Sequence, residues 1–144
     1  CMFARKQWEI PAYMNHGDIP QVSRATSYGG YFGYDFPAPT EDFIDLKDGD
    51  EIKFGNTTLK VMHTPGHSKG GVIYYNEAEK YVITGDSLFA QSIGRTDLPG
   101  GDFDELMASL KNKILALPED TVVYPGHGPQ TDIATEKKTN PFLM

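Results

Sequence analysis

The sequence predicts a mixed α/β fold, and two patterns in it support this prediction. Between residues 43 and 85, short apolar segments alternate with turn residues, as in successive β-hairpins. From residue 103 onward, apolar residues recur every three or four positions, as on one face of a helix. The length of 144 residues suits a single domain spanning residues 1–144, with enough chain to bury a hydrophobic core.

The first part of the chain is predicted to be mainly helical. The expected elements are a helix over 2–8, a short strand over 10–14, a helix over 18–28 and a surface loop over 29–41. Pro11 prevents continuation of the first helix. Asp18 is expected to be the N-cap of the second helix, with Pro20 in its first turn. The loop is predicted from its mixture of Gly, Pro and aromatic residues, which has no periodicity.

The middle of the chain is predicted to form strands joined by tight turns. The expected strands cover residues 43–46, 51–55, 58–64, 71–75, 80–85 and 121–124. Gly55 and Asn56 are typical of a two-residue hairpin turn. The segments 71–75 and 80–85 are apolar runs, as expected of buried strands.

The last part of the chain is predicted to contain a long loop and two helices. Residues 87–101 form the expected loop, and Asp102 with Glu105 resembles the start of a capped helix. The apolar face of this helix is predicted to consist of Phe103, Leu106, Leu110, Ile114 and Leu117. Pro118 is expected to end the helix, and a short final helix is predicted to begin near Thr131.

The charge of the chain argues against two kinds of partner, and its cysteine content excludes an internal disulfide. The net charge of −7 argues against a nucleic-acid surface and against binding to anionic membranes, because both require basic patches. No stretch is long and apolar enough to span a membrane. The single cysteine, Cys1, cannot form an internal disulfide. This suits a reducing compartment, and we expect a cytoplasmic location.

Three short motifs place a candidate metal ligand beside a glycine. They are "HTPGH" at 63–67, "TGD" at 84–86 and "YPGHG" at 124–128. The candidate ligands are His67, Asp86 and His127, and each follows a predicted strand. If these strands end at one edge of one sheet, the three side chains meet there. Imidazole and carboxylate groups suit Zn²⁺, Fe²⁺ or Mn²⁺. Each motif alone is common turn chemistry; the ordered combination favours a metal site.

The flanking glycines and the other histidines have separate expected roles. Gly66, Gly85, Gly126 and Gly128 are expected to permit close approach of the backbone to the site. We expect His63 to be an orienting or structural residue. His16, at a predicted helix start, is expected to lie on the surface.

The ordered combination resembles the metallo-β-lactamase superfamily, and within it the short glyoxalase II-like hydrolases. The segments "HTPGHSKGGVIYY", "YVITGDSLFAQSIGRTDLPGGD" and "LPEDTVVYPGHGP" are similar to that group in order and spacing. The resemblance covers the chain from about residue 10 to its end. It implies an αββα sandwich with a two-metal site at one edge of the sheets.

The resemblance also implies a role for each candidate ligand. His67 matches a histidine on the first metal, His127 matches the last histidine on the second metal, and Asp86 matches the carboxylate that bridges the two. The implied cofactors are two divalent metals, zinc first, with iron or manganese also fitting. The implied chemistry is attack of a metal-bound hydroxide on a thioester carbonyl. Asp86 is then the catalytic residue, because it holds both ions and no separate protein nucleophile is needed.

Arg95 is the candidate substrate-binding residue. It lies in "SIGRTDL", where glyoxalase II-like enzymes carry a basic residue that meets a glutathione carboxylate. The alternative is a local ion pair with Asp97. Asp97 and Pro129 stand where the larger enzymes of the group carry tyrosines. The implied substrate, a small and possibly glutathione-linked thioester, therefore comes from the short subgroup alone.

The four other ligands of the family come from a His-x-His-x-Asp-His motif, which this sequence lacks. Its histidines are at 16, 63, 67 and 127, and none has that spacing. We expect an N-terminally truncated domain that is missing the first strands of the sandwich; a natural protein that lost its metal site is the alternative. Weak or absent metal binding and little or no hydrolysis are expected of the chain alone. Its uncovered sheet is expected to self-associate or to bind the missing N-terminal segment.

Two other functions remain open. "GRTD" also occurs in persulfide dioxygenase-like members of the superfamily, which use one iron held by two histidines and an aspartate. The other alternative is a non-catalytic remnant of the fold that acts as a binding or structural module.

Overall fold

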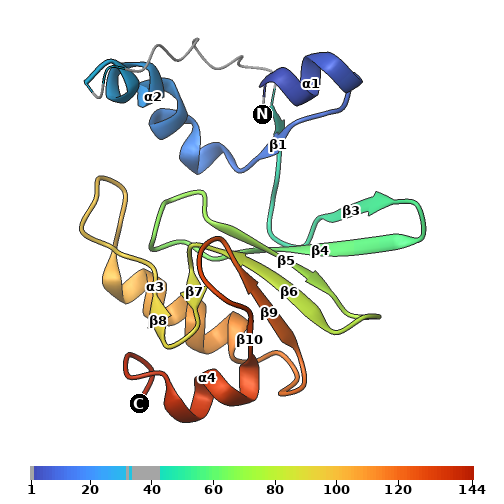
Figure 1. The fold of residues 1–144 in the computed structure, drawn as a ribbon, viewed down its shortest axis with the longest axis vertical. Helices are drawn as coiled ribbons and strands as arrows, with labels where there is room; N and C mark the ends of the chain where they lie inside the picture. Colours follow the sequence, from blue (N-terminus) through green and yellow to red (C-terminus); the bar gives the residue numbers. More distant parts are fainter. Residues whose placement is uncertain (1, 32, 34–42) are drawn as a thin grey trace. The chain divides into compact units, whose positions relative to one another are not determined.

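The computed structural model describes residues 2–31, 33 and 43–144, and the chain forms two compact units in it. The first unit is Cys1–Leu46 and the second is Lys47–Met144. Figure 1 shows the helices and strands of both. The prediction of one domain over residues 1–144 stays a prediction. Among the described residues, no helix combines the length and the apolar character that a membrane crossing requires.

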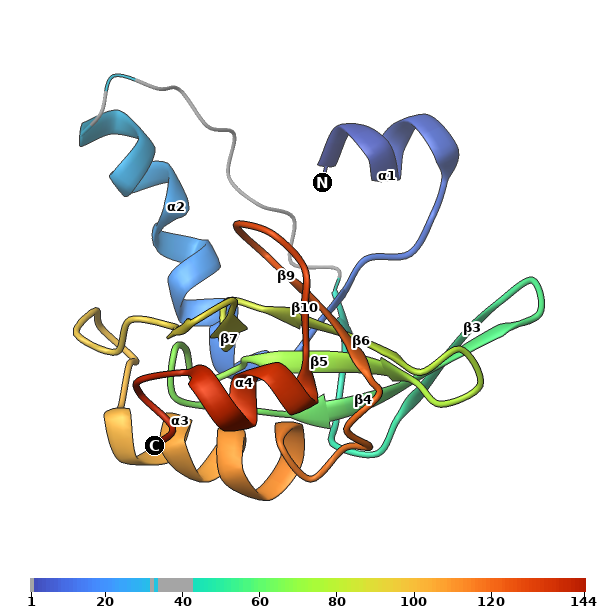
Figure 2. The same ribbon diagram turned by 60° about the horizontal axis from the view of Figure 1, so that its bottom comes forward.

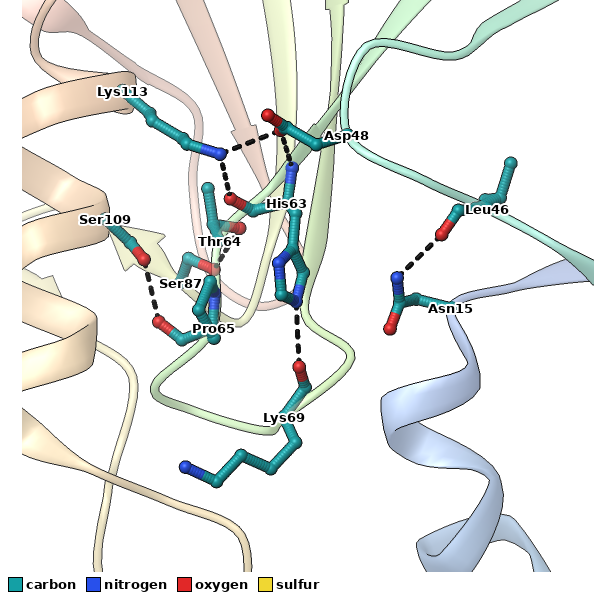
Figure 3. A network of polar contacts seen from close by, with 10 residues as sticks. All are labelled: Asn15, Leu46, Asp48, His63, Thr64, Pro65, Lys69, Ser87, Ser109 and Lys113. Atoms are coloured by element: carbon teal, nitrogen blue, oxygen red, sulfur yellow. Dashed lines mark hydrogen bonds and ion pairs between the residues drawn. The ribbon is translucent and has the colours of Figure 1, made fainter.

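The described residues of the first unit form three helical segments and two very short strands. These are α1 (Met2–Trp8), β1 (Tyr13–Met14), the 3₁₀ turn η1 (His16–Asp18), α2 (Ile19–Tyr31) and β2 (Ile44–Asp45). β1 and β2 pair in parallel. The buried side chain of Asn15 donates a hydrogen bond to the carbonyl of Leu46 over 2.6 Å, as Figure 3 shows. This bond joins the start of the second helix to the chain that follows β2.

The second helix begins within one residue of its predicted start, follows a 3₁₀ turn, and ends later than predicted. The Asn15 side chain accepts a hydrogen bond from the Gly17 amide and caps η1, which continues directly into α2. Asp18 is the last residue of η1 and directly precedes α2, and its predicted role as the N-cap of α2 stays a prediction. α2 also includes residues 29–31, which were predicted to be loop. Most of the remaining predicted loop, residues 32 and 34–41, lies outside the described residues.

The second unit is built on a six-stranded sheet. Its strands are β3 (Glu51–Phe54), β4 (Thr57–His63), β5 (Val72–Asn76), β6 (Tyr81–Gly85), β9 (Val122–Pro125) and β10 (Thr131–Asp132), in the order β10-β9-β6-β5-β4-β3. Neighbours from β3 to β6 are antiparallel, and β6 is parallel to β9. β4, β6 and β9 therefore run in the same direction and end at the same edge, as the motif prediction required.

The predicted long loop over residues 87–101 contains a small hairpin. β7 (Leu88–Phe89) and β8 (Ser92–Ile93) form an antiparallel pair. The prediction of an irregular segment is wrong here, because two-residue strands are too short to show an alternating pattern in the sequence.

Two helices cover one face of the six-stranded sheet, as Figures 1 and 2 show. They are α3 (Phe103–Ser109), which continues as the π-helical turn η2 (Leu110–Ile114), and α4 (Ile133–Thr139). The core between helices and sheet consists of Ile73, Tyr75, Val82, Leu88, Leu106, Leu110, Ile114, Leu117, Val123 and Ile133. Asp102 caps α3 as predicted. Phe103 is 52% exposed, so its predicted place in the core is wrong; it is the first helical residue.

The opposite face of the sheet also carries large apolar side chains. Tyr74 lies opposite Ile83, and Ile83 lies opposite Tyr124, so the three form a row across β5, β6 and β9. Tyr81 joins this row through an edge-to-face contact with Tyr124, with ring centroids 5.9 Å apart. Ile83 is 39% exposed and Tyr124 is 44% exposed. We call these four residues the Ile83 face.

Candidate metal centre

The three predicted ligands all lie in turns that follow strands ending at one sheet edge. His67 follows β4, Asp86 directly follows β6, and His127 follows β9. Because these strands are parallel to one another and belong to one sheet, their following turns gather at the same edge. The sheet thus positions all three residues, although they are far apart in the sequence.

Asp86 lies between the two histidines. Its Oδ1 accepts a hydrogen bond from His127 Nδ1 over 2.9 Å. Its Oδ2 lies 3.8 Å from His67 Nε2. The side chains of His67 and Asp86 are 28% and 32% exposed, whereas that of His127 is 76% exposed. The structure therefore brings the three predicted residues together through the two oxygens of Asp86.

The hydrogen bonds of the two imidazoles determine which nitrogen of each is free. His67 Nδ1 lies 2.8 Å from the backbone carbonyl of Arg95, and a carbonyl oxygen can only accept. His67 therefore donates from Nδ1, and in the neutral ring its Nε2 carries the lone pair. His127 likewise donates from Nδ1 to Asp86. The free Nε2 of each ring is the nitrogen that could bind a metal, and metal-binding histidines usually donate their other ring N–H to a carbonyl or carboxylate.

The candidate ligands form two pairs that share Asp86, and the distance between His67 and Asp86 fits an ion held between them. Metal bonds to imidazole nitrogen and carboxylate oxygen are each about 2.0–2.2 Å long, so two of them span 3.8 Å. Within the described part of the chain, no group of three or more His, Cys, Asp or Glu side chains is arranged to hold one ion. The pairs are His67 with Asp86 and Asp86 with His127.

Two glycines lie where a side chain would collide with Asp86. A Cβ on Gly126 would lie 2.4 Å from Asp86 Oδ1. A Cβ on Gly94 would lie 2.0 Å from the Asp86 backbone oxygen and 3.2 Å from His67 Cβ. Sequence reasoning identified Gly126 but missed Gly94, because Gly94 lies in a segment that was predicted to be irregular.

The other predicted glycines contribute in different ways. A Cβ on Gly66 would lie 2.2 Å from the Leu106 backbone nitrogen, so the turn that carries His67 packs directly against α3. Gly85 and Gly128 have φ angles of +51° and +79° but open space around them. They are needed for backbone conformation and not for close approach.

The turn that carries His67 is supported by a polar network, shown in Figure 3. Lys113 Nζ donates to Asp48 Oδ1 and to the His63 carbonyl, both over 2.7 Å. The His63 amide donates to the same Asp48 oxygen over 2.6 Å, and Ser109 Oγ donates to the Pro65 carbonyl over 2.8 Å. Sequence reasoning missed Asp48, Ser109 and Lys113, because their partners are 15, 44 and 50 positions away.

His63 and Asp48 are both fixed by hydrogen bonds in this network. His63 donates from Nε2 to the Lys69 carbonyl over 2.8 Å, which gives it the predicted structural role. Burial acts to raise the pKa of Asp48, but its hydrogen bonds with Lys113 and the His63 amide outweigh burial and lower that pKa below its usual value.

Arg95 makes the local ion pair that was left open as the alternative. Its Nε and Nη2 donate to the two carboxylate oxygens of Asp97, over 2.8 and 2.7 Å. These hydrogen bonds from Arg95 lower the pKa of Asp97 to about 2. Substrate binding by Arg95 stays a prediction. His16 lies on the surface as expected, with its side chain 72% exposed and 3.2 Å from Asp45.

Comparison with known proteins identifies relatives for most of the chain. A sequence profile described as the metallo-beta-lactamase superfamily matches residues 2–127. The chain is 42% identical over 141 residues to a probable metallo-hydrolase, YqgX, from Bacillus subtilis, covering 96% of the chain. It is 39% identical over 97 residues, 67% of the chain, to the hydroxyacylglutathione hydrolase GloC from Haemophilus influenzae.

A solved structure is also similar over nearly the whole chain. It is that of TTHA1623 in a di-iron-bound form, with a TM-score of 0.88, 38% identity and coverage of 99% of this chain and 69% of that one. The chain spans 66% of the length of the Bacillus relative and 46% of the length of the Haemophilus relative.

Proposed function

The chain belongs to the metallo-beta-lactamase superfamily and has its fold, and we propose that it forms part of a metal-dependent hydrolase. The observation that carries this proposal is Asp86, with one carboxylate oxygen beside His127 and the other beside His67. Both imidazoles use Nδ1 to donate and leave Nε2 free. This arrangement suits a carboxylate that links two ions.

The proposed cofactors are two divalent metals. His67 and Asp86 would hold one, and Asp86 and His127 would hold the other. When bound, such ions lower the pKa of water and polarise a carbonyl group, which is the chemistry that hydrolysis requires. Zinc is proposed first, because imidazole and carboxylate ligands suit it. Iron is the second choice, supported by the di-iron form of a relative that is 38% identical.

The proposed substrate is a small thioester, with glutathione as the favoured thiol. Similarity to a hydroxyacylglutathione hydrolase over 97 residues supports this choice. Arg95 is the proposed contact for a substrate carboxylate. The Arg95 side chain is 60% exposed and its guanidinium already pairs with a carboxylate, so a substrate carboxylate would take the place of Asp97.

We further propose that the site is completed by groups outside these 144 residues. Each candidate ion receives two protein ligands here, whereas catalytic zinc sites usually have three and structural ones four. A His-x-His-x-Asp-His segment, as in the family, would supply the rest. The chain alone is therefore expected to bind metal weakly and to hydrolyse thioesters slowly.

The test combines metal content with turnover. The chain alone and a longer form carrying a His-x-His-x-Asp-His segment are loaded with zinc, dialysed and assayed with S-lactoylglutathione. We expect stoichiometric metal and turnover in the longer form, and loss of both with Asp86→Asn. Asp45→Asn, at an exposed aspartate that pairs with His16, is the matched control.

Three results would contradict or change the proposal. Tight stoichiometric zinc with rapid turnover by the chain alone contradicts the need for further ligands. Bound iron with oxygen consumption on glutathione persulfide, in place of thioester hydrolysis, favours a persulfide dioxygenase. A longer form without metal or activity favours a non-catalytic module.

The Ile83 face is the proposed contact surface. Its half-exposed Ile83 and Tyr124 belong to a row of large apolar residues on a sheet face, a pattern typical of surfaces covered by another element. We propose that either a second copy of the chain or the segment that carries the His-x-His-x-Asp-His motif covers this face.

A further inference from the structure

A buried carboxylate lies under the hairpin that follows Asp86. The side chain of Glu136, in α4, is fully buried. It accepts hydrogen bonds from Thr131 Oγ1 and Asn140 Nδ2, each over 2.7 Å. It also accepts from the backbone nitrogen of Gln91 over 3.0 Å and from Gln91 Nε2 over 3.3 Å. The last two bonds tie α4 to the tip of the β7–β8 hairpin.

Gln91 has an unusual backbone conformation at that tip. Its φ angle is +61°, in the left-handed region that is unfavourable for a non-glycine residue. Such a conformation persists only where the surrounding contacts determine it. Here both the amide and the side chain of Gln91 are bonded to Glu136, and Gln91 Nε2 also donates to Thr139 Oγ1 over 2.6 Å. Glu136 therefore holds the hairpin tip in its strained form.

The same hairpin touches both histidines of the candidate centre. Phe89, in β7, contacts the His127 ring edge-to-face, with centroids 6.0 Å apart. The hairpin closes where the Gly94 amide donates to the Ser87 carbonyl over 3.2 Å. The next carbonyl, that of Arg95, accepts from His67 Nδ1 over 2.8 Å. One short segment thus contacts each of the two outer ligands.

We propose that Glu136 is a positioning residue for the candidate centre. By holding Gln91, it fixes the hairpin, and the hairpin keeps the Arg95 carbonyl against His67 Nδ1. His67 is then held in the Nδ1–H tautomer, with Nε2 free on the side of Asp86. The importance of this for metal binding rests on the proposed function, but the effect on the tautomer does not.

The test reads the tautomers of the histidine rings by NMR. In the ¹⁵N-labelled, metal-free chain at pH 8, we expect His67 in the Nδ1–H form. His63 is an internal reference for the other tautomer, Nε2–H, because its Nε2 donates to the Lys69 carbonyl. In Glu136→Gln, one carboxamide oxygen replaces two acceptors, and we expect His67 to lose its single tautomer while His63 keeps the Nε2–H form.

Two further variants keep the test decisive. Glu119→Gln removes an exposed carboxylate that lies 3.4 Å from Lys137 of α4, and it is expected to leave the His67 tautomer unchanged. Gln91→Gly tolerates the positive φ angle but loses the side-chain bonds to Glu136 and Thr139. It is expected to release His67 partially, and it replaces Glu136→Gln if that variant does not fold.

A zinc titration of the same variants then links the tautomer to metal binding. We expect Glu136→Gln to weaken zinc affinity about 10-fold or more, as is typical when a partner of a ligating histidine is lost. The proposal is overturned if a folded Glu136→Gln or Gln91→Gly chain keeps the wild-type His67 tautomer. Absence of metal binding in the longer form that carries a His-x-His-x-Asp-His segment contradicts the proposed function alone, because the tautomer is read without metal.

Discussion

At the scale of single residues, the candidate centre depends on two glycines that lie against Asp86. Gly94 and Gly126 both lie against Asp86, but against different atoms. Gly94 faces the Asp86 backbone oxygen, which cannot move without moving the chain, and Gly126 faces the carboxylate oxygen Oδ1. A side chain at Gly94 would therefore disturb the backbone, whereas a side chain at Gly126 would displace the carboxylate of the candidate ligand.

Alanine substitution is expected to separate these two effects. Gly94→Ala places a Cβ 2.0 Å from a backbone atom and is expected to lower the free energy of unfolding by about 1–3 kcal/mol, as overpacking does. Gly126→Ala is expected to displace the Asp86 carboxylate, with a smaller loss of stability and weaker zinc binding. Urea unfolding and zinc titration measure the two quantities. Equal losses of stability in both variants would contradict this assignment.

The Arg95–Asp97 pair has a defined pH dependence. The pKa of Asp97 is about 2 in the folded chain, below the ordinary value of 3.8, mainly because of the hydrogen bonds from Arg95. A lowered folded pKa stabilises the pair above pH 3.8, and this contribution is lost as the pH falls towards 2. We expect the Asp97 carboxyl carbon to titrate near pH 2 by NMR.

Arg95→Met provides the control for this titration. Without the guanidinium, the Asp97 midpoint is expected to rise towards its ordinary value. An unchanged midpoint in Arg95→Met would show that another group lowers the pKa of Asp97.

At the scale of elements, the turn between β4 and β5 is held by the helix beneath it. The Leu115 amide bonds to the Leu110 carbonyl over 2.8 Å, which makes η2 a π-helical turn at the end of α3. Such turns often occur at functional sites. Lys113 lies in this turn and reaches both Asp48 and the His63 carbonyl, so the helix contacts the segment that leads to His67.

Removal of the Lys113 ammonium is expected to loosen this segment. Lys113→Met leaves the Asp48 carboxylate and the His63 carbonyl without that donor, and we expect a loss of about 1 kcal/mol in the free energy of unfolding. Amide exchange of His63 is expected to become faster. The control is Lys60→Met, which removes an exposed ion pair with Glu77 and is expected to have no measurable effect on stability. Equal effects of the two substitutions would contradict a special role for Lys113.

At the scale of the whole molecule, the second unit has one sheet face covered by helices and another on which two large apolar side chains are exposed. Two helices bury the first against the core, whereas Ile83 and Tyr124 on the second are 39% and 44% exposed. Both faces are apolar, as in a sheet that is covered on both sides.

The Ile83 face is expected to drive association of the chain. We expect a dimer or a larger species by size-exclusion chromatography with light scattering, and a shift to monomer in the double variant Ile83→Thr, Tyr124→Thr. Phe103→Ser is the control, because Phe103 is 52% exposed but lies on α3, on the helix-covered side of the sheet. A wild-type chain that is monomeric at all concentrations would contradict the prediction.

The sequence by itself predicted the main strands, the apolar helix from residue 103 and the three ligands of the candidate centre. These features follow from local patterns: hairpin turns such as Gly55-Asn56, the cap at Asp102, and ligands placed directly after strands. Local patterns failed where an element was very short, as in β7, β8 and the 3₁₀ turn η1.

Only the tertiary structure decided how the ligands are supported. The Arg95 carbonyl reaches His67 across 28 positions, Lys113 reaches His63 across 50, and Glu136 reaches Gln91 across 45. The physical reason is that strand direction and sheet order determine which distant turns meet, and each of these bonds forms only after the turns have met. The chain's motifs therefore identify the ligands, and its packing determines which nitrogen each histidine leaves free.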